Sequence, residues 1–287
     1  MSKVDIHRYK QRVVIALKKL ERSKLSKETK QDVLDFHRYS LAKGISGCRM
    51  AKYIYNLVLA GELLDKSFTE ATKDDLVKVV NIILEKEWSP HTKHDFNVIL
   101  KRFYKWLEGG DEEYPKKVKW IPTSLKYDNK KLPEELLSKG EVIDLIEAAC
   151  HMRDKALISV LYESGCRIGE VLSLRIKHVT IDDMGGQIIV DGKTGMRRMR
   201  LIASIPYVTT WLEHHPLKND PEAPLWPIIG TRSRNKFLKY QSTSNLIKNL
   251  AKRAGIKKRV HPHIFRHSRA THLANVFTEA QMNHYFG

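Results

Sequence analysis

Three short stretches of the sequence combine cationic side chains with a spacing that suits phosphate chemistry. In the first, Arg167 stands where a helix is expected to begin, after a tight turn over residues 164–166. An arginine at the opening of a helix lies beside backbone N–H groups and the positive end of the helix dipole, and that combination favours a phosphate. The simpler interpretation is that Arg167 pairs with Glu163 or Glu170 on a solvated face.

The other two stretches lie around Lys193 and around the pair His263 and Arg266. Lys193 is expected in or beside a turn between two strands, whereas His263 and Arg266, spaced i, i+3, share one face of an expected helix. With Arg167 they would make two guanidiniums, one ammonium and one imidazole. Such a set suits charge that builds on non-bridging phosphate oxygens, stabilised without a cation. A lysine or a histidine could protonate a leaving alkoxide.

The histidines near the end of the sequence leave a second chemistry open. His261, His263, His267 and His272 are dense, and HxxxH spacing can bind zinc. However, no glutamate completes an HExxH pattern, and Arg266 would lie among the ligands. We therefore expect no metal and no cofactor. A third interpretation is a basic DNA-binding helix with incidental histidines.

Composition favours a polyanionic partner. The 287 residues carry 51 Lys and Arg against 33 Asp and Glu, which gives 51 − 33 = +18, and such an excess favours nucleic acid over a membrane surface. No apolar run approaches the ~20 residues that span a bilayer, and the polar N-terminus has no signal-peptide core. Cys48, Cys150 and Cys166 show no CxxC spacing. They fit free thiols in a reducing compartment, which predicts a cytoplasmic protein without membrane contact.

Cap signals and apolar spacing predict two domains. Residues 1–110 read as helices only, starting with a helix over 6–20 and including a capping box at Thr72 and a helix opened by Ser89. The last of these helices also carries basic side chains that predict a basic outer face, namely Lys93, His94, Lys101, Arg102 and Lys105. Residues 111–132, with proline and lysine but no apolar period, predict a linker.

The remaining residues, 133–287, predict a second domain. Ser138-x-x-Glu141 is a capping box, and residues 152–163 predict a helix leading to Arg167. The segments HVTID, QIIV and MRLI then predict a small antiparallel sheet, followed by helices over 206–214 and 244–254 and a last one from Pro262. The expected fold class is mostly α with a small antiparallel β-sheet (α+β).

Three motifs in this order resemble those of the tyrosine recombinase (phage integrase) family. ESGCRIGEVLSL resembles the first arginine motif of that family, DGKTGMRRMR its lysine β-hairpin, and HPHIFRHSRATHLA its H-x-x-R motif. The resemblance covers about residues 130–287, with a 206–229 segment similar to archaeal integrase-like members; Xer-like members are the other close group. The helical residues 1–110 are similar in position and character to the core-binding domain of the family, which binds DNA.

The resemblance implies a role for each matched residue. Arg167 and Arg266 would hold the scissile phosphate, Lys193 would be the general acid for the 5′-oxygen, His263 would assist proton transfer, and Glu170 would support the site. In the family a tyrosine attacks the phosphate, giving a 3′-phosphotyrosyl link, and strands are exchanged and rejoined without ATP or metal. Four protomers act on two DNA sites through a Holliday junction. The implied partners are therefore double-stranded DNA at a specific recombination site and a homo-tetramer on that DNA, in the integration or excision of a mobile element.

One departure from the family pattern concerns the nucleophile. The family has a Gly-His or Gly-Trp pair before its tyrosine, whereas this sequence ends HYFG, so Gly287 matches that glycine. Tyr285 lies too early, and the expected tyrosine would lie roughly ten residues further on. We therefore expect a C-terminally incomplete catalytic domain that is inactive for cleavage alone. The alternatives are a non-catalytic DNA-binding protein or regulator and a metal-dependent nuclease.

Overall fold

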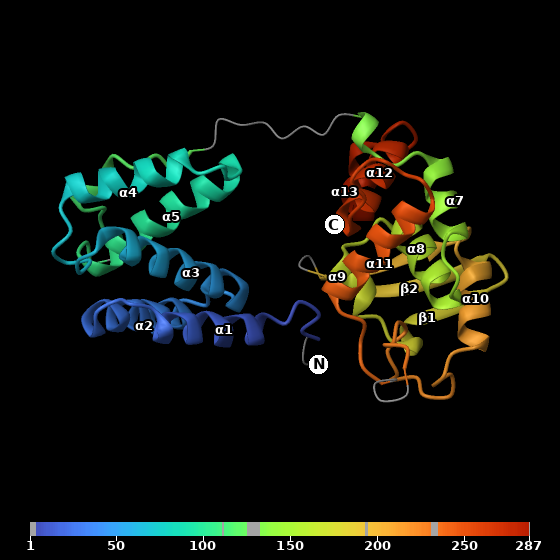
Figure 1. The fold of residues 1–287 in the computed structure, drawn as a ribbon. Helices are drawn as coiled ribbons and strands as arrows, with labels where there is room; N and C mark the ends of the chain where they lie inside the picture. Colours follow the sequence, from blue (N-terminus) through green and yellow to red (C-terminus); the bar gives the residue numbers. More distant parts are fainter. Residues whose placement is uncertain (1–3, 111, 125–132, 193–194, 231–234, 287) are drawn as a thin grey trace. The chain divides into compact units, whose positions relative to one another are not determined.

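The computed structural model describes residues 4–110, 112–124, 133–192, 195–230 and 235–286 (Figure 1). The chain divides into two compact units: Arg8–Asn129 forms one, and Met1–His7 joins Lys130–Gly287 in the other. Helices dominate the described residues, which contain a single three-stranded antiparallel sheet. The predicted α+β class is confirmed. Within the same residues, no helix is long and apolar enough to cross a bilayer.

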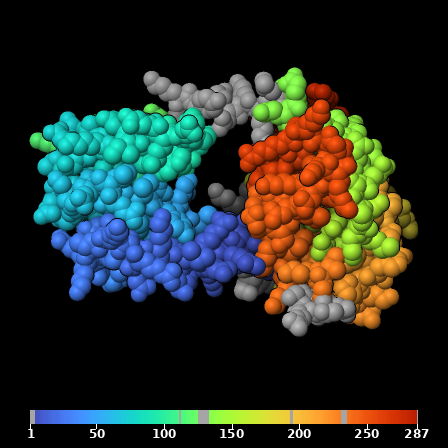
Figure 2. Space-filling view, in the orientation of Figure 1, coloured from blue at the N-terminus to red at the C-terminus, as the bar shows by residue number. Residues whose placement is uncertain are grey.

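The unit Arg8–Asn129 is built around one buried helix. Its elements are α1 (Tyr9–Arg22), α2 (Lys27–Ala42), α3 (Gly47–Leu64), α4 (Lys73–Glu85), α5 (Pro90–Leu107) and α6 (Lys116–Lys119). α3 contacts α1, α2, α4 and α5, and its buried residues Ile54, Leu57 and Val58, spaced i, i+3, i+4, share one face. A wide apolar face of this kind is covered by several neighbouring helices. In the space-filling view these helices form one continuous body, from blue to cyan (Figure 2).

The predicted helix starts in this unit are confirmed where side chains cap them. The Thr72 hydroxyl accepts from the Asp75 N–H while the Asp75 carboxylate accepts from the Thr72 N–H, which completes a capping box. Ser89 caps α5, with Pro90 in its first turn. These local bonds satisfy N–H groups that would otherwise lack partners.

Two lysines of the expected basic face bind carbonyl groups of their own unit. The Lys101 ammonium donates to the carbonyls of Lys119 and Ile121, at 3.1 and 2.9 Å. The Lys93 ammonium donates to the carbonyl of Leu84. Both lysines therefore secure neighbouring segments as well as adding charge, which sequence spacing does not reveal.

The linker predicted over residues 111–132 includes a segment that belongs to the helical unit. Residues 116–119 form α6, which packs against α4 and α5. Val118 and Ile121, spaced i, i+3, are fully buried in the core of the helical unit. Burial of this apolar pair favours attachment of the segment to the bundle. Residues 111 and 125–132 lie outside the described part.

The expected first helix, 6–20, also begins later than predicted. α1 starts at Tyr9, after Arg8 takes a left-handed conformation (φ 55°) that turns the chain. Ile6 is only 3% exposed and belongs to the core of the other unit, where its carbonyl accepts the N–H of Tyr240 at 3.4 Å. Its apolar side chain therefore serves a different core from the one that helical spacing predicts.

The second unit is also built around a central helix. Its helices are η1 (Pro133–Glu135), α7 (Lys139–Glu147), α8 (Met152–Ser164), α9 (Ile168–Leu172), η2 (Ile176–His178), α10 (Ile205–Glu213), α11 (Tyr240–Arg253), α12 (Pro262–Ala274) and α13 (Glu279–Phe286). α8 contacts α7, α9, α10, α12 and the sheet. Residues 156–161 of α8 are buried without interruption. The predicted capping box at Ser138 is confirmed at the start of α7.

The sheet presents one apolar face to the core and carries the expected lysine hairpin. β1 (Val179–Asp182), β2 (Gly185–Gly192) and β3 (Gly195–Leu201) are antiparallel in the order β1-β2-β3. Val190 pairs with Arg197, and Gly192 pairs with Gly195 at the end of the β2–β3 hairpin. The predicted strands are confirmed. Lys193, which lies between β2 and β3, is outside the described residues.

Candidate active site

The turn between α8 and α9 brings Arg167 to the surface. α8 ends at Ser164, and Gly165 follows with φ 56°, a left-handed conformation that favours glycine. A Cβ at Gly165 would lie 2.5 Å from Cε1 of Phe286, so the turn also needs a residue without a side chain. Cys166 is buried, and Arg167 is the N-cap residue of α9. The prediction that Arg167 follows a turn between two helices is confirmed.

Glu170 binds Arg167 at both its backbone and its side chain. The Arg167 N–H donates to Oε2 of Glu170 at 2.9 Å, and the guanidinium of Arg167 donates to Oε1 at 3.2 Å. The N–H that could have met a phosphate is thus taken, and α9 is only five residues long. Any phosphate binding here would depend on the guanidinium rather than on a helix end.

Glu163, the other carboxylate considered for Arg167, has a different role. Its carboxylate accepts the N–H groups of Ile202, Ala203 and Ser204, at 2.8–2.9 Å, just before α10 begins. These N–H groups belong to the turn that leads into α10, and the carboxylate satisfies them. Glu163 therefore ties α8 to α10.

A second guanidinium, from Arg197 on β3, binds the same carboxylate as Arg167. Its two terminal nitrogens donate to Oε2 and Oε1 of Glu170 at 2.7 and 3.4 Å, and one of them also donates to the sulfur of Cys166 at 3.6 Å. Glu170 is 4% exposed. A Cβ at Gly192 would lie 2.2 Å from its Oε1, so the hairpin can approach this carboxylate only with glycine there.

The two guanidiniums control the ionisation of the buried carboxyl. Burial raises the pKa of Glu170, but the hydrogen bonds from Arg197 and from the Arg167 N–H outweigh burial, and the net pKa lies below its usual range. Burial likewise lowers the pKa of Arg197, and the bond to Glu170 outweighs it, so that pKa is raised. Glu170 is therefore an ionised carboxylate at neutral pH.

Arg266 reaches the same turn from α12. Its guanidinium donates to the carbonyl of Gly165 at 3.1 Å and to that of Phe286 at 2.9 Å, and it lies 5.0 Å from the Phe286 ring centre. Burial, followed by the positive charge of Arg167, lowers the pKa of Arg266. The two arginines from separate motifs are therefore close enough for their charges to interact.

Of the other two predicted site residues, the structure describes His263 but not Lys193. His263 is exposed on α12, three residues before Arg266. Lys193 lies outside the described residues; in the sequence it falls between Gly192 and Gly195, which pair at the end of the hairpin. The structure thus brings Arg167 and Glu170 into direct contact and places Arg266 at the same turn, bound to the Gly165 carbonyl.

Tyr285 has a structural environment. Its hydroxyl donates to the carbonyl of Glu163, and its ring packs edge-on against Phe277 at 5.6 Å. Burial raises its pKa. It packs against the core of the unit, as predicted for an aromatic residue at this position.

The histidine-rich end of the sequence does not form a ligand cluster in the described part. No group of three His, Cys, Asp or Glu side chains there is placed to hold a metal ion. His272 shares a hydrogen bond with the hydroxyl of Tyr162 at 2.8 Å. The zinc interpretation therefore lacks a geometric basis among these residues.

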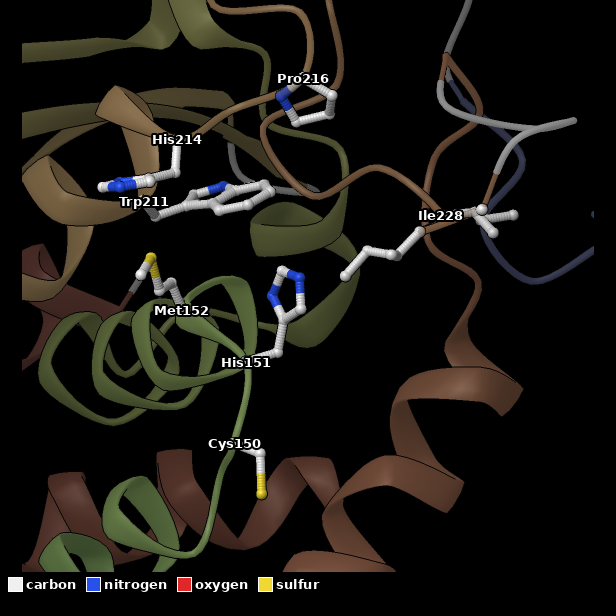
Figure 3. Close-up of a pocket in the computed structure, with 9 residues that line it drawn as sticks. Cys150, His151, Met152, Trp211, His214, Pro216 and Ile228 are labelled. Atoms are coloured by element: carbon white, nitrogen blue, oxygen red, sulfur yellow. The ribbon is translucent and has the colours of Figure 1, made fainter.

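A separate cavity of about 510 Å³ lies at the opposite end of α8 from Arg167 (Figure 3). The His151 and Trp211 rings meet edge-on there, at 5.7 Å. Its lining residues are Cys150, His151, Met152, Trp211, His214, Pro216, Ile228, Ile229 and Gly230. Neither Arg167, His263 nor Arg266 lines it, so it is distinct from the arginine site.

Sequence reasoning missed Arg197, although a signal was present. On a strand, side chains alternate between faces, so Arg197 shares a face with Met199 and Leu201. Those two residues are buried, and an arginine in line with them needs a carboxylate partner. Reading the period of two through MRRMRL identifies Arg197, rather than Arg198, as the residue that faces inward.

Known proteins have sequences and folds similar to those of this chain. The model of the Phage integrase family matches residues 135–282. The tyrosine recombinase XerD of Pseudomonas putida is 28% identical over 253 residues, covering 82% of this chain and 80% of XerD. The tyrosine recombinase XerA of Pyrococcus horikoshii is 27% identical over 252 residues, covering 84% of this chain and 79% of XerA.

A solved structure extends the likeness to the fold. The lambda integrase tetramer bound to a Holliday junction matches with a TM-score of 0.68 at 13% identity, over 89% of this chain and 76% of that one. The family model covers more than half of the 287 residues, and the same stretch contains the two-arginine site. The chain belongs to the phage integrase family.

Proposed function

We propose that this chain is a site-specific DNA recombinase that cuts and rejoins strands through a 3′-phosphotyrosyl intermediate. The observation that carries the proposal is the meeting of Arg167 and Arg266 at the turn around Gly165, where Arg266 donates to the Gly165 carbonyl. Two guanidiniums held in fixed orientations suit a phosphodiester, whose non-bridging oxygens gain negative charge during transfer.

The proposed roles follow the chemistry of the side chains. Arg167 and Arg266 hold the scissile phosphate, and Glu170 keeps Arg167 in place. A tyrosine oxygen attacks phosphorus while the bond to the 5′-oxygen breaks, and Lys193, assisted by His263, gives that oxygen its proton. The phosphodiester energy is kept in the tyrosyl link, so rejoining by the reverse step needs no ATP and no metal ion.

We further propose that the nucleophile is not among the tyrosines of residues 1–287. Tyr285, the tyrosine that follows the H-x-x-R motif, donates its hydroxyl to Glu163 and packs into the core. An attacking oxygen must instead reach the phosphate held by the arginines. This chain is then inactive for cleavage by itself.

Double-stranded DNA is the proposed partner, and four protomers are proposed to assemble on it, as lambda integrase does on a Holliday junction. The unit Arg8–Asn129 would bind DNA as well. Helix α1 offers exposed cations for this: Lys10, Arg12, Lys18, Lys19 and Arg22. We propose that the protein acts in the cytoplasm, since all three cysteines are free thiols. Its proposed role there is the integration or excision of mobile DNA.

Binding should depend strongly on salt. Each phosphate neutralised by a lysine or arginine releases counterions, so log K should fall by about 0.9 per unit of log salt for each contact. Titrating a labelled duplex at several salt concentrations, by fluorescence anisotropy, measures this slope. A flat salt response would contradict the electrostatic basis of the proposed DNA binding.

A covalent-capture experiment tests the chemistry. A duplex selected from random sequence by binding to the chain is nicked, mixed with the chain in EDTA, and run on a denaturing gel. We expect no protein–DNA adduct, although a native gel shows a tight complex. An adduct would show that a tyrosine within residues 1–287, such as Tyr285, is the nucleophile, and DNA cutting that needs a divalent ion would instead support a nuclease.

The engaged Tyr285 hydroxyl also favours a second candidate, a DNA-binding protein or regulator without catalysis. The two functions differ at the arginines. A regulator needs them only for affinity, so replacing either one would change duplex binding and nothing else. A recombinase needs them for cleavage once a tyrosine is supplied.

A further inference from the structure

The Glu170 carboxylate lies between two guanidiniums that come from different elements. Arg167 belongs to the turn before α9, and Arg197 belongs to β3. Arg197 makes the shorter contact, 2.7 Å to Oε2, whereas the Arg167 guanidinium donates to Oε1 at 3.2 Å. Arg197 therefore binds this carboxylate more closely than Arg167 does.

Arg197 is mostly withdrawn from solvent, at a cost to stability. Its side chain is 12% exposed, and its Nε has no hydrogen-bond partner among the described residues. A buried donor without a partner is unfavourable, and a buried ion pair often stabilises a fold no better than apolar residues of similar size. Packing alone therefore does not explain an arginine on the inward face of β3.

Charge gives a better explanation. Glu170 and Arg167 alone would form a neutral pair, and the carboxylate would draw the guanidinium toward itself and away from an anion. With Arg197 present, the three groups carry a net charge of +1. The Glu170 carboxylate already makes its preferred bidentate contact, with the Arg197 guanidinium. Arg266 lies close enough for its charge to interact with all three groups, so the cluster as a whole stays cationic.

We propose that Arg197 is a positioning residue for Arg167: it holds and neutralises Glu170, so that Glu170 orients the Arg167 guanidinium without cancelling its charge toward a phosphate. This inference rests on the proposed function, because it assigns Arg167 to the phosphate. It adds a residue from the lysine hairpin that acts through Glu170 and does not touch the DNA.

The first test follows the carboxylate. In Arg197→Gln the Glu170 carboxyl loses its closest cation, so its pKa, followed by carbon-13 NMR in the full chain, should rise. The groups that face Glu170 in this titration are Cys166, Arg167, Arg197 and Arg266. Arg197→Lys keeps the positive charge but loses the bidentate contact of the guanidinium, and should give a smaller rise in the pKa of Glu170.

The second test follows the anion site. Sulfate, a divalent anion with no titration of its own near neutral pH, is added while the Nε–H signal of Arg167 is observed by NMR. We expect Arg197→Gln to bind sulfate about tenfold more weakly than the unaltered chain, because Glu170 would then draw the Arg167 guanidinium away from the anion and weaken that one charge-assisted contact. Arg197→Lys should recover part of that affinity.

A matched control separates this role from a general effect of charge. Arg200→Gln removes an arginine from the same strand, where it pairs with Asp182 at 2.7 Å on the other face. It should leave both the Glu170 titration and sulfate binding unchanged. The amide spectrum of each variant shows whether it folds; if Arg197→Gln does not, Arg197→Lys carries the comparison.

The outcomes distinguish this inference from the function on which it rests. If Arg197→Gln titrates and binds sulfate as the unaltered chain does, Arg197 has no positioning role. If the unaltered chain shows no response to sulfate at Arg167, the phosphate assignment and the proposed function fail. In that case the Glu170 titration still decides whether Arg197 holds the carboxylate, and an unchanged titration would overturn the inference by itself.

Discussion

Replacing Arg167 with alanine is expected to lower the rate of strand cleavage by about 10²–10³-fold, as for loss of one donor that stabilises a developing oxyanion. Duplex affinity should be almost unchanged, because many phosphates contribute to binding and Arg167 contacts one. The measurement is formation of a covalent protein–DNA adduct over time, in a version of the chain extended to include the nucleophilic tyrosine, with affinity measured in parallel.

Arg200→Ala is the control for this experiment. It removes an arginine of the same unit that pairs with Asp182, and both cleavage and binding should remain near those of the unaltered protein. Cleavage that survives Arg167→Ala would refute the site assignment. Equal losses of cleavage and of duplex affinity would indicate that Arg167 serves DNA binding, as in the regulator alternative.

Replacing Glu170 with alanine should give the largest loss of stability, about 3–5 kcal/mol in the free energy of unfolding of the second unit. The change leaves two guanidiniums, from Arg167 and Arg197, without their shared carboxylate, and it leaves the Arg167 N–H without its acceptor. Denaturant unfolding, followed by the fluorescence of the buried Trp211 and Trp226, measures the loss.

The stabilisation by Glu170 should also depend on pH. Its pKa in the folded protein is below its ordinary value of 4.5, so the folded state favours the ionised form. The contribution is then complete above about pH 4.5 and is lost as the pH falls through the folded pKa. The difference in stability between the unaltered chain and Glu170→Ala should therefore shrink in acid.

Glu141 provides a matched control for Glu170. It occupies the same position in the capping box of α7 and pairs with one cation, Lys258, but its side chain is 23% exposed. Glu141→Ala should cost only about 1 kcal/mol, as for loss of a cap. Equal losses for the two variants would contradict the special role of the buried carboxylate.

Local signals in the sequence predicted much of this structure. Thr72 and Ser138 cap their helices as expected, and the turn at Gly165 places Arg167 at the start of α9. Each of these features depends on residues within a few positions of one another, so their spacing contains the information. The order of the motifs then predicted that Arg167 and Arg266 belong to one site.

Contacts between distant segments could not be predicted in the same way. Arg197 meets Glu170 only because the β2–β3 hairpin packs beside α9 through β2. Ile6 belongs to the core of the second unit, and its carbonyl binds Tyr240, more than two hundred positions later. Apolar spacing shows that Ile6 and Val118 prefer a core, but it does not show which core. Tertiary packing decides which core each residue joins, and a single sequence does not show how distant segments pack.

The burial of Ile6 in the second unit has a consequence for synthesis on the ribosome. The carbonyls of Asp5 and Ile6 bind Lys239 and Tyr240, which are made far later. At about 5–20 residues per second, these first residues wait roughly 10–50 seconds for their partners. The helical bundle that begins at Arg8 can fold during that time. The second unit completes its core only when synthesis of the chain is almost finished, and it must then bind the segment that was made first.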